Sequence, residues 1–234
     1  MTIANDSLTS STFESELLAA VMQHSMLKHP FYVAWSEGKL SKEILREYAN
    51  QYYAHVRAFP TYVSAVHSHC DDLETRQMLL ENLIEEEQGE ENHPELWLRF
   101  AESLGMTRDE VRNAQLLPAT KDSVARLKQL TQSVDYREGL AALYAYETQI
   151  PEVAKTKRAG LKEFYGIDDE RGVSFFRIHE SIDIIHQQVE MRILSSECHS
   201  SDDQIKTILA AKEAAKALWS FLDGVSAAYM ESDS

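Results

Sequence analysis

His179, Asp183 and His186 are the residues of this chain whose types and spacing are most suggestive of chemistry. We predict that they share one long amphipathic helix over residues 170–197. An α-helix turns about 100° per residue, so steps of four and three residues would place the three side chains in one stripe. Apolar residues flank this stripe on the same side: Phe175, Phe176, Ile182 and Val189. The stripe therefore faces the core, where a bound cation would offset the cost of burying these polar groups.

Two imidazoles and a carboxylate are the ligand set of many non-haem iron sites. On this helix alone, a pair of core histidines hydrogen-bonded to Asp183 explains the pattern nearly as well. Glu86 and His93 are also seven residues apart, with Glu90 between them on the same face if the segment is helical. Gly89 interrupts that spacing, and a solvated acidic surface is the alternative interpretation of this acidic run.

Glu147 is a third signal, because it lies in the apolar stripe of a predicted helix where a carboxylate needs a partner. A dinuclear metal site built on the helices of a bundle would explain all three segments. Oxygen and imidazole donors suit iron or manganese better than copper or structural zinc. The predicted ligands of two divalent metal ions are Glu86, His93, Glu147, His179, Asp183 and His186. A mononuclear site on the His179 helix alone is the nearest rival.

The elements that position these residues are predicted to be helices, since no segment alternates apolar and polar residues over a strand's length. We predict a polar tail over 1–10 and one all-α domain over 11–234, a bundle of seven or eight helices. Capping boxes are expected at Ser11 with Glu14, Thr107 with Glu110, and Ser201 with Gln204. Breaks are expected at Gly89, Pro94, Gly105 and Pro151, a kink at Pro60, and a loop or short helical turn over 29–40.

The composition of the chain argues against several classes of protein. The chain has 23 basic and 38 acidic side chains, so its net charge of −15 argues against a nucleic-acid partner. Two cysteines cannot form a disulfide framework or a cysteine-based zinc site. No basic and apolar leader is present, and no stretch approaches the roughly 20 apolar residues of a membrane span. We therefore expect a cytoplasmic protein without a membrane partner.

The pattern Glu86-x6-His93, Glu147 and His179-x3-Asp183-x2-His186 resembles the ligand signature of the haem-oxygenase-like di-metal oxidases. Within them the chain resembles the chlamydial protein associating with death domains and its bacterial relatives, the self-sacrificing para-aminobenzoate synthases. The similarity extends from about residue 13 to about residue 229. It implies a haem-oxygenase-like bundle, a homodimer, and a metal pair of two irons or of iron with manganese.

The resemblance also implies an unusual reaction, in which O2 and an external reductant are consumed and the protein itself is the precursor. A tyrosyl side chain is cut from its backbone, its ring and Cβ become para-aminobenzoate for folate synthesis, and a lysine supplies the nitrogen. Tyr32 matches the sacrificed tyrosine and Lys157 the amino donor. Tyr48 and Tyr146 resemble further positions that line the pocket with rings. Each chain would then act once.

Two other functions stay open from the sequence. The di-metal site could oxidise an external amino acid or fatty acid, in which case an added substrate would be required. The bundle could instead be a protein-interaction module without metal dependence. Elemental analysis separates the module from the enzymes, and product formation without added substrate separates the two enzymes.

Overall fold

The computed structural model describes residues 8–230, and these residues form helices and connecting turns without a strand. The elements are α1 (Ser10–Met22), η1, a 3-10 helix (Met26–Lys28), α2 (Pro30–Ser36), α3 (Lys42–His69), α4 (Leu73–Glu87), α5 (His93–Ser103), α6 (Arg108–Arg112), α7 (Pro118–Thr131), α8 (Tyr136–Glu147), α9 (Ile150–Tyr165), α10 (Glu170–His179), α11 (Ile182–Glu197) and α12 (Ser201–Tyr229). The predicted all-α class is confirmed. Residues 1–7 of the predicted tail and residues 231–234 lie outside the described part.

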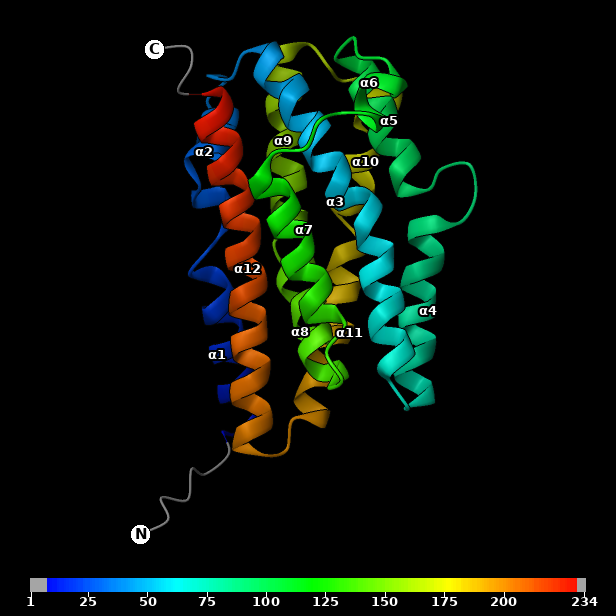
Figure 1. Ribbon diagram of the computed structural model, residues 1–234, viewed down its shortest axis with the longest axis vertical. Coiled ribbons are helices and arrows are strands. Elements are labelled where there is room, and N and C mark those ends of the chain that lie inside the picture. Colours follow the sequence, from blue (N-terminus) through cyan, green and yellow to red (C-terminus); the bar gives the residue numbers. More distant parts are fainter. Residues whose placement is uncertain (1–7, 231–234) are drawn as a thin grey trace.

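The helices are arranged as a bundle along one long axis (Figure 1). Helix α12 packs against α1, α7 and α8, while α3 packs against α4, α7 and α8. Helices α9, α10 and α11 lie behind these in Figure 1 and close the bundle. A continuous apolar core runs through it, and the buried polar residues that matter for function are embedded in this core.

Helix starts follow local capping chemistry. The predicted capping box of Thr107 and Glu110 is confirmed at the start of α6. At the other two helices the cap was predicted one or two residues too late, and the cap found at α1 is a single side-chain hydrogen bond in place of the predicted box. Thr9 caps α1 by accepting a hydrogen bond from the Thr12 backbone N–H. At α12 the box pairs Ser200 with Asp203 in place of the predicted pair.

Segment 29–40 contains a true helix, α2, where the sequence indicated a loop or a short turn. Pro30 occupies the first turn of α2, where its fixed φ is compatible with the helix and its missing N–H is not needed. His29 caps this helix through its side chain, which accepts from the Phe31 backbone N–H at 3.1 Å. The proline therefore begins a helix instead of breaking one.

The prediction of one long helix over 170–197 is wrong, because the helix is interrupted at Glu180 and Ser181 and divides into α10 and α11. Ser181 has φ −121°, far from the helical value near −63°. Breaks of this kind also explain why the described residues contain twelve α-helices where seven or eight were predicted. The break separates His179 from Asp183 and His186, so their alignment does not come from one helical stripe.

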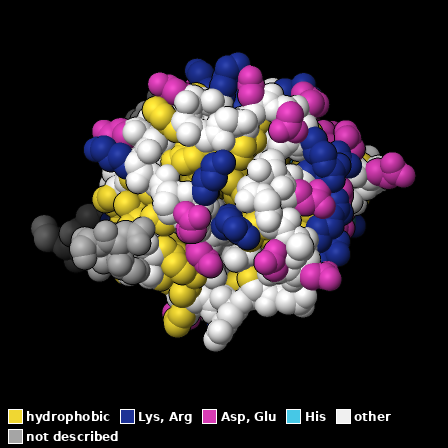
Figure 2. Space-filling view, turned by 90° about the horizontal axis from the view of Figure 1, so that it is seen from above, with side chains coloured by type: hydrophobic (Ala, Val, Ile, Leu, Met, Phe, Trp, Pro, Cys, Tyr) yellow, Lys and Arg dark blue, Asp and Glu magenta, His cyan; other side chains and the backbone are white. Residues whose placement is uncertain are grey.

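The surface carries both signs of charge. At the end of the bundle seen in Figure 2, Lys and Arg side chains are interspersed with Asp and Glu.

Among the described residues, no helix has both the length and the apolar character that spanning a bilayer requires.

Candidate metal centre

Glu86 and His93 come from different helices, although the sequence suggested one helical face. Glu86 is in the last turn of α4, and His93 is the first residue of α5. Gly89 lies in the turn between them with φ +83°, a conformation that favours glycine. Asn92 then caps α5 by accepting from the Glu95 backbone N–H at 3.0 Å. Glu90 is exposed in this turn, whereas Glu86 and His93 are buried.

Glu86, His93 and His179 form the first group of candidate ligands. Their ligand atoms lie within 4.8 Å of one another, and all three residues are buried. His93 Nδ1 is 2.8 Å from Glu86 Oε2. His179 Nδ1 is 2.7 Å from the Phe175 carbonyl oxygen, which can only accept, so Nδ1 carries the proton. The other nitrogen, Nε2, therefore keeps its lone pair free for a metal ion.

Glu147, Asp183 and His186 form the second group, whose ligand atoms also lie within 4.8 Å of one another. His186 Nδ1 is 3.5 Å from Glu147 Oε1 and 3.8 Å from Asp183 Oδ1. The other ring nitrogen of His186, Nε2, is 2.8 Å from Glu85 Oε2. The amide of Asn82 donates to Glu147 Oε1 at 2.9 Å. Glu85 and Asn82 thus orient two of the candidate ligands from outside, as is common around metal sites.

Members of both groups line one cavity of about 30 Å³. Two of their buried carboxylate oxygens, Glu147 Oε2 and Asp183 Oδ2, have no hydrogen-bond partner in the described residues, and His93 Nδ1 and His186 Nδ1 face carboxylates of the centre at 2.8 and 3.5 Å. Leaving such atoms unsatisfied is costly, and two divalent cations would satisfy all of them. The donor set of carboxylates and imidazoles therefore fits a pair of iron or manganese ions.

The electrostatics of the centre reflect its crowding with carboxylates. Burial, and next the negative charges of Glu147 and Glu86, raise the pKa of Asp183 well above its usual value. Burial, helped by His93, lowers the pKa of His179 and keeps that ring neutral. Burial alone would lower the pKa of His186, but hydrogen bonding and charge from Glu147 and Glu85 raise it to about 9.

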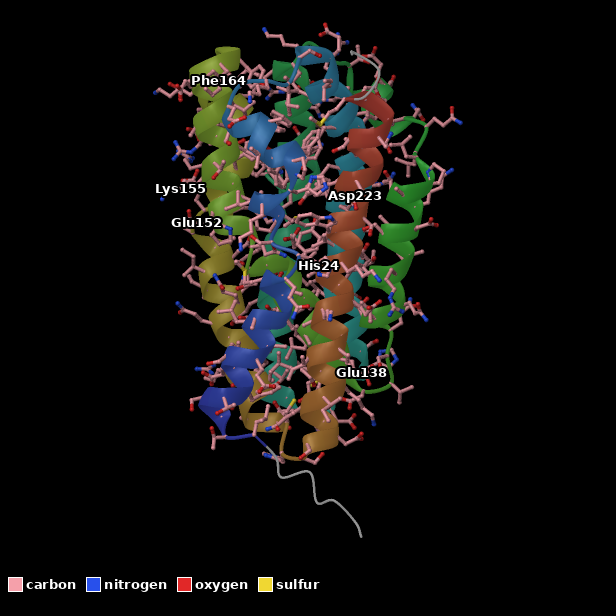
Figure 3. The ribbon with its side chains drawn as sticks, turned by 90° about the vertical axis from the view of Figure 1, so that its left-hand side faces the viewer. His24, Glu138, Glu152, Lys155, Phe164 and Asp223 are labelled. Atoms are coloured by element: carbon pink, nitrogen blue, oxygen red, sulfur yellow. The ribbon has the colours of Figure 1, made fainter. Side chains whose placement is uncertain are left out.

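Tyr32 and Lys157 lie together in the core, next to Tyr48. Lys157 on α9 is only 4% exposed, so it is not the surface charge that its basic neighbours suggested. Its Nζ donates to the Tyr48 hydroxyl at 2.6 Å, and that hydroxyl is 2.9 Å from the Tyr32 hydroxyl. Lys155, two residues earlier, points outward from α9 (Figure 3). The helix therefore directs one lysine into the protein and the other into water.

The amine of Lys157 lies 4.7 Å from the centroid of the Tyr32 ring and 4.8 Å from those of Tyr48 and Tyr52. No carboxylate is paired with it among the described residues. Burial lowers its pKa well below the usual value for lysine, which favours the neutral, nucleophilic amine.

Stacked rings connect this cluster with the metal cavity. Tyr48 and Tyr52 stack with centroids 5.4 Å apart, and the Tyr52 and Tyr146 hydroxyls are 2.8 Å apart. Tyr52 and Tyr146 line the cavity, whereas Tyr32 does not. The sequence did not distinguish Tyr52 from an ordinary core aromatic, and no spacing signal marked Glu85 or Asn82 as neighbours of the centre.

The profile of the family described as iron-containing redox enzymes matches residues 46–219. The chain belongs to this family. A protein of Nitrosomonas europaea named 4-aminobenzoate synthase is 40% identical to it over 93% of this chain and 92% of its own length. A protein of the same name from Chlamydia trachomatis is 41% identical over 90% of each chain. The resemblance drawn from the ligand pattern is thus confirmed at the level of the family.

Comparison with solved structures tests the predicted fold. A domain of unknown function from Shewanella denitrificans, described as having a haem-oxygenase-like fold, superposes with a TM-score of 0.77 at 20% identity. The match covers 97% of this chain and 96% of that one. The predicted haem-oxygenase-like fold is therefore confirmed.

Proposed function

We propose that this protein makes 4-aminobenzoate from its own Tyr32 side chain, with Lys157 as amino donor, in a single turnover per chain. The observation that carries the proposal is the buried contact of Lys157, Tyr48 and Tyr32, which the Tyr52 ring connects to a cavity suited to two metal ions. The names of the relatives from Nitrosomonas and Chlamydia support the product. The metal ligands we propose are Glu86, His93, Glu147, His179, Asp183 and His186.

The chain's own residues position the reactants without a substrate-binding step. The Tyr32 ring is tethered by its backbone and held by packing, so proximity replaces capture from solution. The Tyr48 hydroxyl lies between the amine and the phenol and can hold a proton for either. Bound iron or manganese ions would supply activation of O2, with an external reductant as co-substrate.

Mass spectrometry of the whole chain tests this proposal. Purified protein loaded with Fe(II) and Mn(II) is exposed to O2 and a reductant, with no organic substrate added. We expect 4-aminobenzoate at no more than one molecule per chain, and a matching loss of mass at Tyr32. Protein labelled with ring-¹³C tyrosine and ¹⁵N lysine should pass both labels to the product. Product that accumulates while Tyr32 stays intact would rule out the sacrifice and favour oxidation of an external substrate.

Lys157→Met is the matching variant, and Lys155→Met is its control. Methionine has a similar length to lysine, so we expect the free energy of unfolding to change by less than about 1.5 kcal/mol. The Lys157 variant should form no 4-aminobenzoate, whereas the Lys155 variant should match the wild type. Equal yields from the two variants would remove Lys157 as the donor.

Two further parts of the proposal concern the protein's state in the cell. We propose a homodimer, which light scattering of the purified protein tests directly. We also propose that it works in the cytoplasm, supported by two free cysteines, Cys70 and Cys198, both buried. Fractionation of cells that express the protein would test its location.

A further inference from the structure

Glu190 is a buried carboxylate beside the metal centre that the six proposed ligands leave unexplained. It lies on α11, four residues after His186, and is 3% exposed. Neither of its oxygens has a hydrogen-bond partner in the described residues. Its carboxyl group lies near enough to Glu147, which is itself a carboxylate and a proposed ligand, for the two groups to interact electrostatically.

A second cavity, of about 100 Å³, brings Glu190 next to the second ligand group. Glu190, Asn82 and His186 line this cavity between α4 and α11. Asn82 donates to Glu147, and His186 presents Nδ1 to Glu147 and Asp183. Glu190 therefore belongs to the surroundings of the second group, and it does not line the cavity of about 30 Å³ that the three residues of the first group line.

Charge balance gives the physical reason for a carboxylate at this place. Glu86, Glu147 and Asp183 are buried and together carry three negative charges, against four positive charges on two divalent ions. Glu190 brings the number of buried carboxylates to four, which makes the loaded centre neutral. Helix bundles that hold two metal ions commonly use four carboxylates in this way. Neutrality favours the burial of ions in a medium of low dielectric constant.

We propose that Glu190 is a fourth carboxylate of the di-metal centre and serves the metal position formed by Glu147, Asp183 and His186. The inference rests on the proposed di-metal centre but not on the fate of Tyr32 or Lys157. The alternative is a structural role, in which Glu190 carries a proton and donates a hydrogen bond to Glu147. Glu190→Gln separates the two roles, because the amide can donate that hydrogen bond but cannot supply a charged ligand.

Equilibrium dialysis against Mn(II) alone, at one fixed pH, provides the test. The wild type should bind two ions per chain. Glu190→Gln should keep one ion at wild-type affinity and bind the other roughly 10- to 100-fold more weakly. Glu81→Gln is the matched control, since Glu81 lines the same cavity but is exposed, and it should bind both ions as the wild type does.

Thermal unfolding of the metal-free proteins completes the experiment. Without metal, Glu190→Gln should unfold at the same temperature as the wild type or higher, because its neutral amide can donate a hydrogen bond to Glu147 and removes any negative charge from the buried cluster. A metal-free variant less stable than the wild type would show that Glu190 supports the fold through a contact that glutamine cannot make, and would overturn the inference. Two ions bound at unchanged affinity by Glu190→Gln would also overturn it. Fewer than two ions on the wild type would instead overturn the di-metal centre itself.

Discussion

Lys157 shows how the environment of one residue sets its chemistry. An ammonium group loses several kcal/mol of hydration when it is buried without a carboxylate partner, so the neutral amine is favoured. The partner that the structure provides is the Tyr48 hydroxyl at 2.6 Å. A neutral amine can form a bond to carbon, whereas an ammonium group has no lone pair for this purpose.

The Tyr48 hydroxyl is expected to control how efficiently the cluster reacts. Tyr48→Phe removes the hydroxyl that hydrogen-bonds with both Lys157 and Tyr32 and leaves the stacked ring in place. We expect the yield of 4-aminobenzoate per chain to fall by roughly 10- to 100-fold, because the reacting groups lose their alignment. Quantifying product by mass spectrometry measures this effect.

Tyr165→Phe is the control for that variant, since the buried Tyr165 hydroxyl donates to the Leu40 carbonyl oxygen at 2.9 Å. Tyr165→Phe loses one buried hydrogen bond and Tyr48→Phe loses two, at a cost of about 1 kcal/mol each. A Tyr48 variant whose yield equals that of the Tyr165 variant would show that the bridging hydroxyl has no part in the reaction.

At the scale of elements, the reacting pair depends on how closely α2 approaches α9. Tyr32 lies on α2 and Lys157 on α9. Trp35 on α2 donates its indole N–H to the Lys157 carbonyl oxygen at 3.1 Å. A Cβ at Gly160 would lie 2.8 Å from Trp35 Cδ1, so the absence of a side chain at Gly160 permits this contact.

Gly160→Ala should therefore separate the two helices. We expect a loss of about 1–3 kcal/mol in the free energy of unfolding, from overpacking, and a fall in 4-aminobenzoate per folded chain. Chemical denaturation and product analysis measure the two effects. Ala159→Gly, at an exposed position of the same helix, costs about 1 kcal/mol through helix propensity but should keep full yield. Full yield from Gly160→Ala would show that this approach does not align the pair.

At the scale of the whole molecule, the proposed metal ions would connect helices whose buried carboxylates otherwise repel one another. The ligands come from α4, α5, α8, α10 and α11, and four buried carboxylates lie among them. Without metal, the protein relieves this repulsion by holding protons, as the raised pKa of Asp183 shows. Metal binding must release these protons, so loading and pH are coupled.

The stabilisation by saturating Mn(II) should accordingly be larger at pH 8 than at pH 6. His186, with a pKa of about 9, holds a proton throughout this range in the metal-free protein, and the raised pKa of Asp183 acts in the same direction. Each proton released makes binding up to about tenfold tighter per pH unit. The shift in unfolding temperature that Mn(II) causes at each pH measures this coupling. In His186→Gln we expect this shift to depend less on pH. A shift that is equal or smaller at pH 8 would contradict it.

The sequence by itself was sufficient for the helical class, the family and the six candidate ligands. Caps, apolar periodicity and inward-facing polar residues are local properties, so they can be recognised without knowing how the helices pack. The residue pattern from Glu86 to His186 could be matched to a family for the same reason.

Only the tertiary structure decided which side chains meet. His179 and Asp183 belong to two helices, because the backbone breaks at Ser181, and a periodic pattern does not reveal such a break. Four residues that no sequence pattern marks become neighbours of the centre only through packing between helices: Tyr52, Asn82, Glu85 and Glu190. The burial that makes Lys157 a candidate donor likewise depends on the surfaces that cover it, and contacts between distant segments leave no signal in local spacing.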